Sequence, residues 1–373
     1  MNPSMSRVLG VTAAVGGLVA LSLAGVTAAT AEPATGSFTG SDASAAAAPA
    51  LDRYQGADRF ATAADIAGRA YPDGAGTVII ANGVQFPDAL SAAPAAALIE
   101  APLLLTAPNA LPSSVADRLV ALKPRNVVVI GGVNAVSPAV ATQIGKITGA
   151  TVDRVQGADR YATSRAVVDA FFAETGVYRA FVTSGLNFPD AVSASAAAGA
   201  GSTDSTGAPD AVVLVPGTAD GVDQPTSDLF ESLGVESVAV VGGPAVISDG
   251  IVSDLDAQFP GEVALLAGQD RYETSAFVSF FAFSDATGDV PRTDDSGTVY
   301  LASGQNFPDA LAIAAVAGAE KSPVLLTAPG CTNYYAEDLI AGLASEKVVT
   351  IGGTAAVSEN AAALNYCPGP PRT

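Results

Sequence analysis

Residues 56–62 read Gly-Ala-Asp-Arg-Phe-Ala-Thr, and the same pattern returns at residues 157–163 and 268–274. The intervals between the three copies are 101 and 111 residues, which is the length of a small domain rather than of a solenoid repeat. A chain of 373 residues is long enough for three such units, each with its own core. The pattern therefore predicts three tandem copies of one folded unit.

Three further motifs follow the first one, in the same order, in each copy. The second is a Phe-Pro-Asp-Ala motif that follows Asn-Gly or Ser-Gly, at 82–89, 184–191 and 303–310. The third is an apolar run that ends in Thr, at 102–106 and 323–327, with a looser counterpart at 212–216. The fourth is a β-branched run that ends in two glycines and is followed by Ser, at 127–137, 238–248 and 348–358. This fixed order makes the internal repeat a specific signal.

Within each copy, short β-branched runs alternate with Ala-rich stretches of helical period. In copy one we expect strands at 51–54, 77–81, 103–106 and 127–130, and helices at 59–70, 87–99, 112–122 and 137–147. Right-handed crossovers between parallel strands place helices on both faces of a sheet. The expected fold class is therefore α/β, with three tandem doubly wound domains and parallel sheets. These domains are expected at residues 51–150, 151–261 and 262–373.

The N-terminal segment has the features of a secretory signal. Arg7 supplies a short positive region, an apolar stretch runs from Val8 to about Ala29, and a small-x-small site ends at Ala31. We expect residues 1–31 to be a cleaved signal peptide, the alternative being a retained membrane anchor. No other segment has the roughly 20 apolar residues of a spanning helix, so no membrane span is expected after cleavage.

Two other segments stand outside the repeated motifs. Residues 32–50 are Ala, Ser, Thr, Gly and Pro with almost no bulky side chains, which predicts a flexible linker. Copy three contains an acidic stretch between its first helix and second strand, with Asp285, Asp289, Asp294 and Asp295. A solvated insertion and a calcium loop both fit that stretch, although the EF-hand spacing is absent.

Composition restricts the chemistry of the chain. It contains no His, which removes the usual general base of Ser and Cys hydrolases and the usual zinc ligand. Trp is also absent, so stacking on sugar rings cannot be the main recognition mode. The formal net charge of −20 disfavours nucleic acid as a partner, and an acidic polymer would have to be held in local pockets. We expect no catalytic residue, cofactor or metal, and export would permit a disulfide between Cys331 and Cys367.

Candidate contact residues lie at the carboxyl ends of the expected strands, where ligands of doubly wound sheets bind. Each pair of glycines either forms a tight turn or presents backbone amides to an anionic group. The pairs are Gly131 with Gly132, Gly242 with Gly243, and Gly352 with Gly353. The polar residue before the Phe-Pro-Asp-Ala motif is expected to have a free side chain, and it is Asn82, Ser184 or Ser303.

The charged residues of the repeated motifs have two interpretations each. The Asp and Arg of the first motif could form a local ion pair that caps a helix and docks it. Alternatively, each Arg could bind a phosphate or carboxylate group of a polymer through its guanidinium group. The arginines are Arg59, Arg160 and Arg271. The Asp after each Pro complements the helix macrodipole, and these residues are Asp88, Asp190 and Asp309.

Taken together, the four motifs resemble the cell-wall-binding repeat type 2 family, which occurs as triplets in exported Gram-positive surface proteins. The resemblance covers residues 51–373. It implies three Toprim-like domains around a pseudo-threefold axis, a surface location, and non-covalent attachment to an anionic secondary wall polymer such as a teichoic-acid-like glycan. It also implies contact residues Thr106 and Thr327 at the ends of the Leu-Leu-Thr strands. Copy two departs from the pattern, because Pro216 stands where these copies have Thr.

The leading hypothesis is a secreted, monomeric, non-catalytic protein that holds a cell-wall polymer through three repeats. The residues fit teichoic acid, arabinogalactan and peptidoglycan equally. One alternative is an S-layer-like structural protein whose triplet mediates self-assembly or protein contact. Another is a wall glycan hydrolase that uses two carboxylates such as Asp58 and Asp88.

Overall fold

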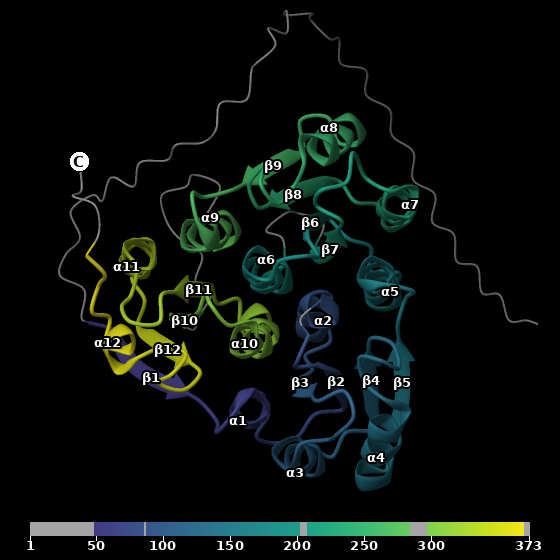
Figure 1. Ribbon diagram of the computed structural model, residues 1–373, viewed down its shortest axis with the longest axis vertical. Helices are drawn as coiled ribbons and strands as arrows, with labels where there is room; N and C mark the ends of the chain where they lie inside the picture. The colour runs from purple at the N-terminus through teal and green to yellow at the C-terminus, as the bar shows by residue number, and fades with distance from the viewer. Residues whose placement is uncertain (1–47, 86, 202–206, 284–296, 369–373) are drawn as a thin grey trace, which may run out of the picture. The chain divides into compact units, whose positions relative to one another are not determined.

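The computed structural model describes residues 48–85, 87–201, 207–283 and 297–368, which belong to one compact unit. Strands and helices alternate through the described part of the chain (Figure 1). The expected signal peptide, most of the expected linker and the acidic stretch of copy three lie outside the described residues. In the described ranges, no helix has both the length and the apolarity needed to cross a membrane.

The elements follow the same order in each repeat. Copy one contains β1 (Ala50–Tyr54), α1 (Arg59–Ala70), β2 (Thr77–Asn82), α2 (Pro87–Leu98), β3 (Leu103–Thr106), α3 (Ser113–Leu122), β4 (Asn126–Ile130) and α4 (Pro138–Thr148). Copy two contains β5 (Thr151–Val155), α5 (Arg160–Phe172), β6 (Arg179–Ser184), α6 (Pro189–Ala200), β7 (Ala211–Val215), α7 (Gln224–Leu233), β8 (Ser237–Val241) and α8 (Asp249–Gln258). Copy three contains β9 (Val263–Leu266), α9 (Arg271–Phe283), β10 (Thr298–Ser303), α10 (Phe307–Ala319), β11 (Val324–Thr327), α11 (Tyr334–Gly342), β12 (Lys347–Ile351) and α12 (Glu359–Ala362). The limits predicted for copy one agree with these to within one residue.

The strands form three parallel sheets of four strands, which confirms the predicted α/β class. Sheet 1 has the order β3-β2-β4-β5, sheet 2 the order β7-β6-β8-β9, and sheet 3 the order β11-β10-β12-β1. Each sheet thus takes its fourth strand from the next copy, and the first strand of the chain completes the sheet of the last copy. The boundaries predicted near Ala150 and Gly261 divide the sequence repeats, and the strand after each boundary belongs to the preceding sheet.

The strand β1 closes the arrangement by pairing with β12 over its whole length. The register runs from Ala50 opposite Lys347 to Tyr54 opposite Ile351, and the two strands lie side by side in Figure 1, one purple and one yellow. An ion pair of 3.0 Å joins Lys347 Nζ to Asp52 on the neighbouring strand. The beginning and the end of the described chain are therefore parts of one sheet.

Three equivalent helices, α2, α6 and α10, pack on one another and are almost entirely buried. Equivalent positions on them carry Ala97, Gly199 and Gly318. A Cβ atom added to Gly199 would lie 3.0 Å from both Gly318 Cα and Ala97 Cβ, so these helices approach closely only because the residues are small. Equivalent positions thus meet at one place, as the expected pseudo-threefold arrangement requires.

The first repeated motif is a capped helix start. Asp159 Oδ1 accepts hydrogen bonds from the amides of Tyr161 and Ala162, at 2.9 and 2.8 Å, and Asp58 and Asp270 cap α1 and α9 in the same way. Thr163 Oγ1 accepts a hydrogen bond of 3.0 Å from the amide of Gly157. A Cβ on that glycine would overlap the backbone of the next helical turn, so the motif requires Gly there. The Arg that follows each capping Asp lies near the copy whose sheet precedes it, as Arg160 of copy two does with Asp88 of copy one.

Candidate functional site at the repeat junctions

The repeated motifs meet in three equivalent places, one at the carboxyl end of each sheet, and we call these places junctions 1, 2 and 3. Each junction combines the Asp of the Phe-Pro-Asp-Ala motif, the glycine pair of the same copy, and the Arg of the first motif of another copy. Junction 1 contains Asp88, Gly131 and Arg160; junction 2 contains Asp190, Gly242 and Arg271; junction 3 contains Asp309, Gly352 and Arg59. These motifs were expected at the strand ends, but the sequence does not show that the Arg of each junction comes from another copy.

The first glycine of each pair forms a tight turn. Gly131, Gly242 and Gly352 have backbone φ angles of 102°, 117° and 95°, which residues other than glycine rarely adopt. A Cβ at any of the three would also overlap or crowd Oδ2 of the junction carboxylate. For the first glycine, the structure therefore supports the turn interpretation.

The second glycine of each pair is available for contact with a ligand. Gly132, Gly243 and Gly353 are half-buried, and a Cβ there would meet nothing nearer than 3.6 Å. In the described part of the chain, no acceptor is paired with the amide N–H of these three glycines. An amide donor at a strand end is therefore left for a partner in each junction.

The junction carboxylates are mostly buried, and their pKa values reflect it. Burial raises the pKa of Asp88 and of Asp309, and it raises the pKa of Asp190 to about 6. The neighbouring Arg of the other copy opposes the shift in each case. Oδ1 of Asp309 is buried, and no hydrogen-bond donor is paired with it among the described residues. Junction 3 therefore contains a buried acceptor without a paired donor as well as the amide of Gly353.

The junction arginines fasten loops of their own copy. Nη1 of Arg59, Arg160 and Arg271 donates a hydrogen bond to the carbonyl oxygen of the glycine in the second motif, at 2.9, 2.6 and 2.7 Å. The guanidinium carbon of Arg59 also lies 5.8 Å from the ring centroid of Phe307, in another copy. The structure thus does not place these arginines in a local ion pair with the preceding Asp. Part of each guanidinium group is used in a hydrogen bond to the backbone.

The polar residues at the ends of β2, β6 and β10 are buried, which the sequence analysis did not expect. Asn82, Ser184 and Ser303 are 2%, 3% and 1% exposed. Each accepts a hydrogen bond from an amide of the following loop, and the shortest, from Val84 to Asn82 Oδ1, is 2.7 Å. The expectation that these side chains are free is wrong, because the loop amides beside them need acceptors.

The threonines at the ends of β3 and β11 are also turned inward. Thr106 and Thr327 have no exposed surface. Thr106 Oγ1 donates to the carbonyl of Ala110 at 3.2 Å, and Thr327 Oγ1 donates to that of Cys331 at 3.1 Å. Cys331 is joined to Cys367 by the disulfide that the sequence analysis allowed. These threonines hold the loop beside the junction, and their role in ligand contact stays a prediction.

Two residues, one on the strand β5 that the next copy supplies and one directly after it, were missed by sequence reasoning. Arg154 on β5 donates hydrogen bonds of 2.5 Å to the Gly131 carbonyl and 2.8 Å to the Val136 carbonyl, so it clamps the Gly-Gly loop of junction 1. Gln156 is exposed, and its Oε1 lies 3.6 Å from where a Cβ on Gly132 would be. The available signal was an Arg-x-Gln-Gly pattern at 53–56 and 154–157, directly before the first motif.

Junction 3 has the same two residues. Nη1 of Arg53 on β1 donates to the carbonyls of Gly352 and Val357, at 2.7 and 2.9 Å. Oε1 of Gln55 lies 3.6 Å from where a Cβ on Gly353 would be, and this glutamine is exposed. The closing strand β1 therefore completes a junction as well as a sheet.

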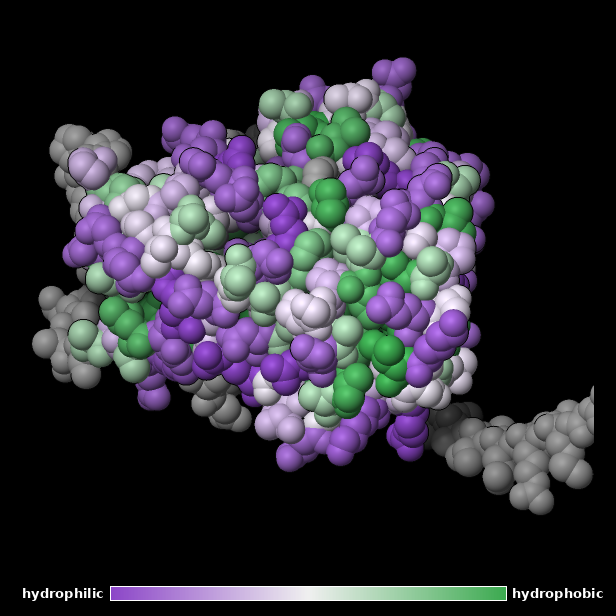
Figure 2. Space-filling view, turned by 60° about the horizontal axis from the view of Figure 1, so that its bottom comes forward, coloured by the Kyte–Doolittle hydropathy of each residue, from purple (hydrophilic) through white to green (hydrophobic). Residues whose placement is uncertain are grey.

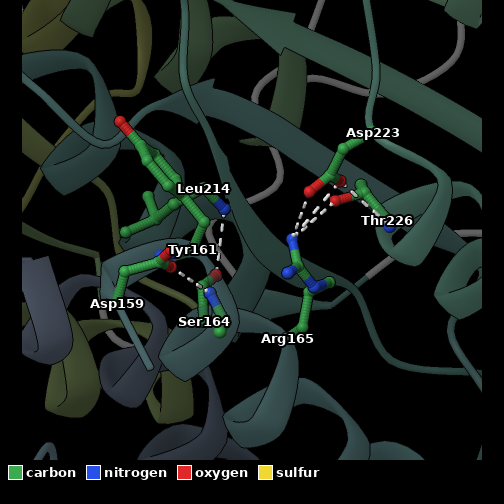
Figure 3. Close-up of polar contacts among 8 residues, drawn as sticks. Asp159, Tyr161, Ser164, Arg165, Leu214, Asp223 and Thr226 are labelled. Atoms are coloured by element: carbon green, nitrogen blue, oxygen red, sulfur yellow. Dashed lines mark hydrogen bonds and ion pairs between the residues drawn. The ribbon is translucent and has the colours of Figure 1, made fainter. Parts of the chain in front are cut away.

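A shallow groove of ≈ 400 Å³ between α5 and α7 is a weaker candidate. Its Arg165 donates to Asp223 and to Thr226 Oγ1, the latter at 3.1 Å, while the neighbouring Ser164 accepts a hydrogen bond from the Leu214 amide (Figure 3). The positions that correspond to Arg165 in the other copies are Ala64 and Ala276, so the contacts of Arg165 with Asp223 and Thr226 belong to copy two alone. The groove is thus explained by the docking of α5 on α7.

The remaining surface offers no concentrated apolar face in the view of Figure 2, where hydrophilic residues surround smaller hydrophobic patches. Of the large apolar side chains in the described ranges, Leu265 on β9 is the most exposed, at 60%. In the same part of the chain, no group of three or more His, Cys, Asp or Glu residues is arranged to hold a metal ion. The junctions are therefore the sites that recur with the repeat.

Comparison with known protein families matches three segments, residues 53–141, 154–252 and 266–362, to the family described as Cell wall binding domain 2 (CWB2). The chain belongs to the CWB2 family. Each matched segment contains all four motifs of one repeat, and the three together cover most of the chain. The family resemblance noted in the sequence is thus confirmed.

Two curated relatives contain a similar region. The chain is 29% identical over 302 residues to the N-acetylmuramoyl-L-alanine amidase LytC of Bacillus subtilis (strain 168), covering 81% of this chain and 55% of the relative. It is 26% identical over 283 residues to the amidase enhancer of the same organism, covering 76% of this chain and 35% of that protein. The CWB2 chain therefore spans about half or less of the length of these relatives.

Two solved structures share the fold. Cwp6 from Clostridium difficile superposes with a TM-score of 0.74 at 24% identity, covering 91% of this chain and 51% of Cwp6. Cwp8 from the same organism gives a TM-score of 0.68 at 24% identity, covering 82% of this chain and 49% of Cwp8. At this identity the likeness concerns the fold of the CWB2 triplet.

Proposed function

We propose that this CWB2 protein attaches non-covalently to a secondary cell-wall polymer, and that the Gly-Gly loops at the repeat junctions make the contact. The observation that carries the proposal is the recurrence of one mixed polar group at the carboxyl end of each sheet, in a chain of a wall-binding family. Ligands of open α/β sheets bind at this end of the strands.

The junction chemistry suits a glycan. A sugar hydroxyl both donates and accepts hydrogen bonds, so it can accept one from the half-buried amide of Gly353. An anionic substituent of the same polymer would be held by loop amides and by the exposed Arg59. The net charge of −20 opposes general attraction of a polyanion, so the binding energy would come from these local contacts.

Several finer aspects belong to the same proposal. We infer that the chain is exported, with residues 1–31 removed, that it acts as a monomer at the cell wall, and that it is not itself an enzyme. The two relatives are named as an amidase and an amidase enhancer, and the part that they share with this chain would be their wall attachment. Asp58, a candidate acid of the hydrolase alternative, caps a helix by accepting two amide hydrogen bonds, and Asp88 lies in junction 1 near Arg160.

Co-sedimentation tests this function. The purified chain is mixed with cell walls of its own organism, before and after acid extraction of the secondary polymers. We expect binding to intact walls and its loss after extraction. Undiminished binding to extracted walls would indicate that the ligand is peptidoglycan. The absence of binding to intact walls would contradict the proposed function.

A further inference from the structure

The three junctions are built to the same plan but are not equally complete. Where β5 and β1 carry Arg154 and Arg53, the equivalent residue of β9 is Leu265. Two residues after each of these arginines stands a glutamine, Gln156 or Gln55. The equivalent residue in junction 2 is Ala267. Junction 2 therefore lacks both side chains that face the Gly-Gly loop in the other two.

A third difference comes from another part of the sequence. The strand register pairs Ser184 with Val215 at the end of β7, whereas the equivalent residues at the ends of β3 and β11 are threonines. Val215 belongs to copy two, and Leu265 and Ala267 belong to copy three. The sheet order β7-β6-β8-β9 brings both departures into sheet 2. Differences that are scattered over two repeats in the sequence thus converge on one junction in the structure.

The missing Arg changes how well the loop is held. In junctions 1 and 3 the guanidinium group bonds the carbonyl of the first glycine and a second carbonyl five residues on, at 2.5 to 2.9 Å. No side-chain donor reaches Gly242 or Ile247 in this way among the described residues, and Leu265 is 60% exposed. A loop held in its binding conformation loses less entropy when a ligand binds, so junctions 1 and 3 are the better organised.

The missing Gln leaves junction 2 without an exposed carboxamide beside its second glycine. Gln55 and Gln156 are exposed and lie beside the second glycine, whose amide has no partner in the described part of the chain. A carboxamide next to a free backbone N–H offers donors and an acceptor to the hydroxyl and amide groups of a glycan. Ala267 offers neither, although its Cβ is 3.8 Å from the corresponding point on Gly243.

We propose that the chain holds its wall polymer at two sites, junctions 1 and 3, and that junction 2 serves only to build the fold. The inference rests on the proposed function. It assigns polymer binding to Gln55 and Gln156 and to the Gly-Gly loops that Arg53 and Arg154 hold in place. Binding is then divalent, with one site on the first sheet and the other on the sheet completed by β1.

A matched set of charge substitutions tests this assignment. The variants Gln55→Glu, Gln156→Glu and Ala267→Glu each add one negative charge at an exposed, equivalent position, so the net charge changes alike in all three. Apparent affinity is measured by co-sedimentation of the full chain with walls of its organism. We expect the two Gln variants to bind about five-fold or more weakly, from the loss of one hydrogen bond, and Ala267→Glu to bind as the unmodified chain does.

A double substitution that removes both carboxamides without adding charge gives a second test. Gln55→Ala with Gln156→Ala makes junctions 1 and 3 resemble junction 2 and should weaken binding about 25-fold. Equal weakening by all three Glu variants, or full binding by the double Ala variant, would overturn the two-site assignment while leaving wall binding in place. Failure of the unmodified chain to bind walls would instead remove the proposed function, and the assignment with it.

Discussion

Replacing Asp190 by Asn should stabilise the folded chain at neutral pH, although it removes a charge that faces Arg271. Burial raises the pKa of Asp190 from 3.8 to about 6, with the Arg271 charge opposing the shift. The folded chain therefore binds more protons than the unfolded chain between these two pKa values. Linkage then requires the free energy of unfolding to fall as pH rises through this window and to stay low above it.

The magnitude follows from the size of the shift. A shift of about two pKa units corresponds to about 2 to 3 kcal/mol at pH 7.5, because each unit corresponds to about 1.4 kcal/mol. An Asn has no charge to bury, so Asp190→Asn should gain most of this at pH 7.5. Near pH 3.5 the variant and the unmodified chain should differ little, since Asp190 is then protonated in both states.

Urea unfolding at a series of pH values from 3.5 to 8 measures the effect. The control is Asp256→Asn, which removes an exposed carboxylate of α8. An Asp190→Asn variant that is less stable than the unmodified chain at every pH would refute the reasoning, because it would show that the attraction of Arg271 outweighs burial.

Other substitutions test the fold and the junctions. Arg154→Leu should lower the free energy of unfolding by about 2 to 4 kcal/mol in urea, because two hydrogen bonds from a charged group are lost. Gly318→Ala should lower the melting temperature, at a cost of about 1 to 3 kcal/mol, because its Cβ would lie 2.7 Å from Gly199 Cα. Ser164→Ala should cost about 1 to 3 kcal/mol in urea, since the buried Leu214 amide loses its acceptor. Replacing Cys331 and Cys367 by Ser should cost about 3 to 4 kcal/mol by calorimetry, from a sequence separation of 36 residues, and a reductant should have no further effect on that variant.

Most of the fold was accessible from the sequence. The alternation of β-branched and Ala-rich segments located the strands and helices of copy one, because buried parallel strands and buried helices have distinct composition and length. Sequence periodicity could not show which sheet a strand joins. Thr151–Val155 follows one repeat and begins the next, and only three-dimensional packing places it beside β4.

The candidate site was accessible in parts. The glycine pairs and the motif arginines were found because their spacing recurs. Asn82 was misjudged, because its position at a strand end suggested a free amide and the structure uses that amide in a loop turn. Arg154 and Gln156 were missed, since their pattern occurs in only two copies and their partners lie in the preceding repeat.

The pairing of β1 with β12 also has a kinetic consequence. The partners Ala50 and Lys347 are separated by almost the whole described chain, so this sheet cannot be completed until the last repeat has been made. Contacts of such long sequence separation slow folding, because the intervening chain must be ordered first. Until then the edge of β12 is exposed, and the β1 strand of another molecule presents the same surface. Refolding yield should therefore fall with protein concentration, as strand exchange between molecules competes with closure within one.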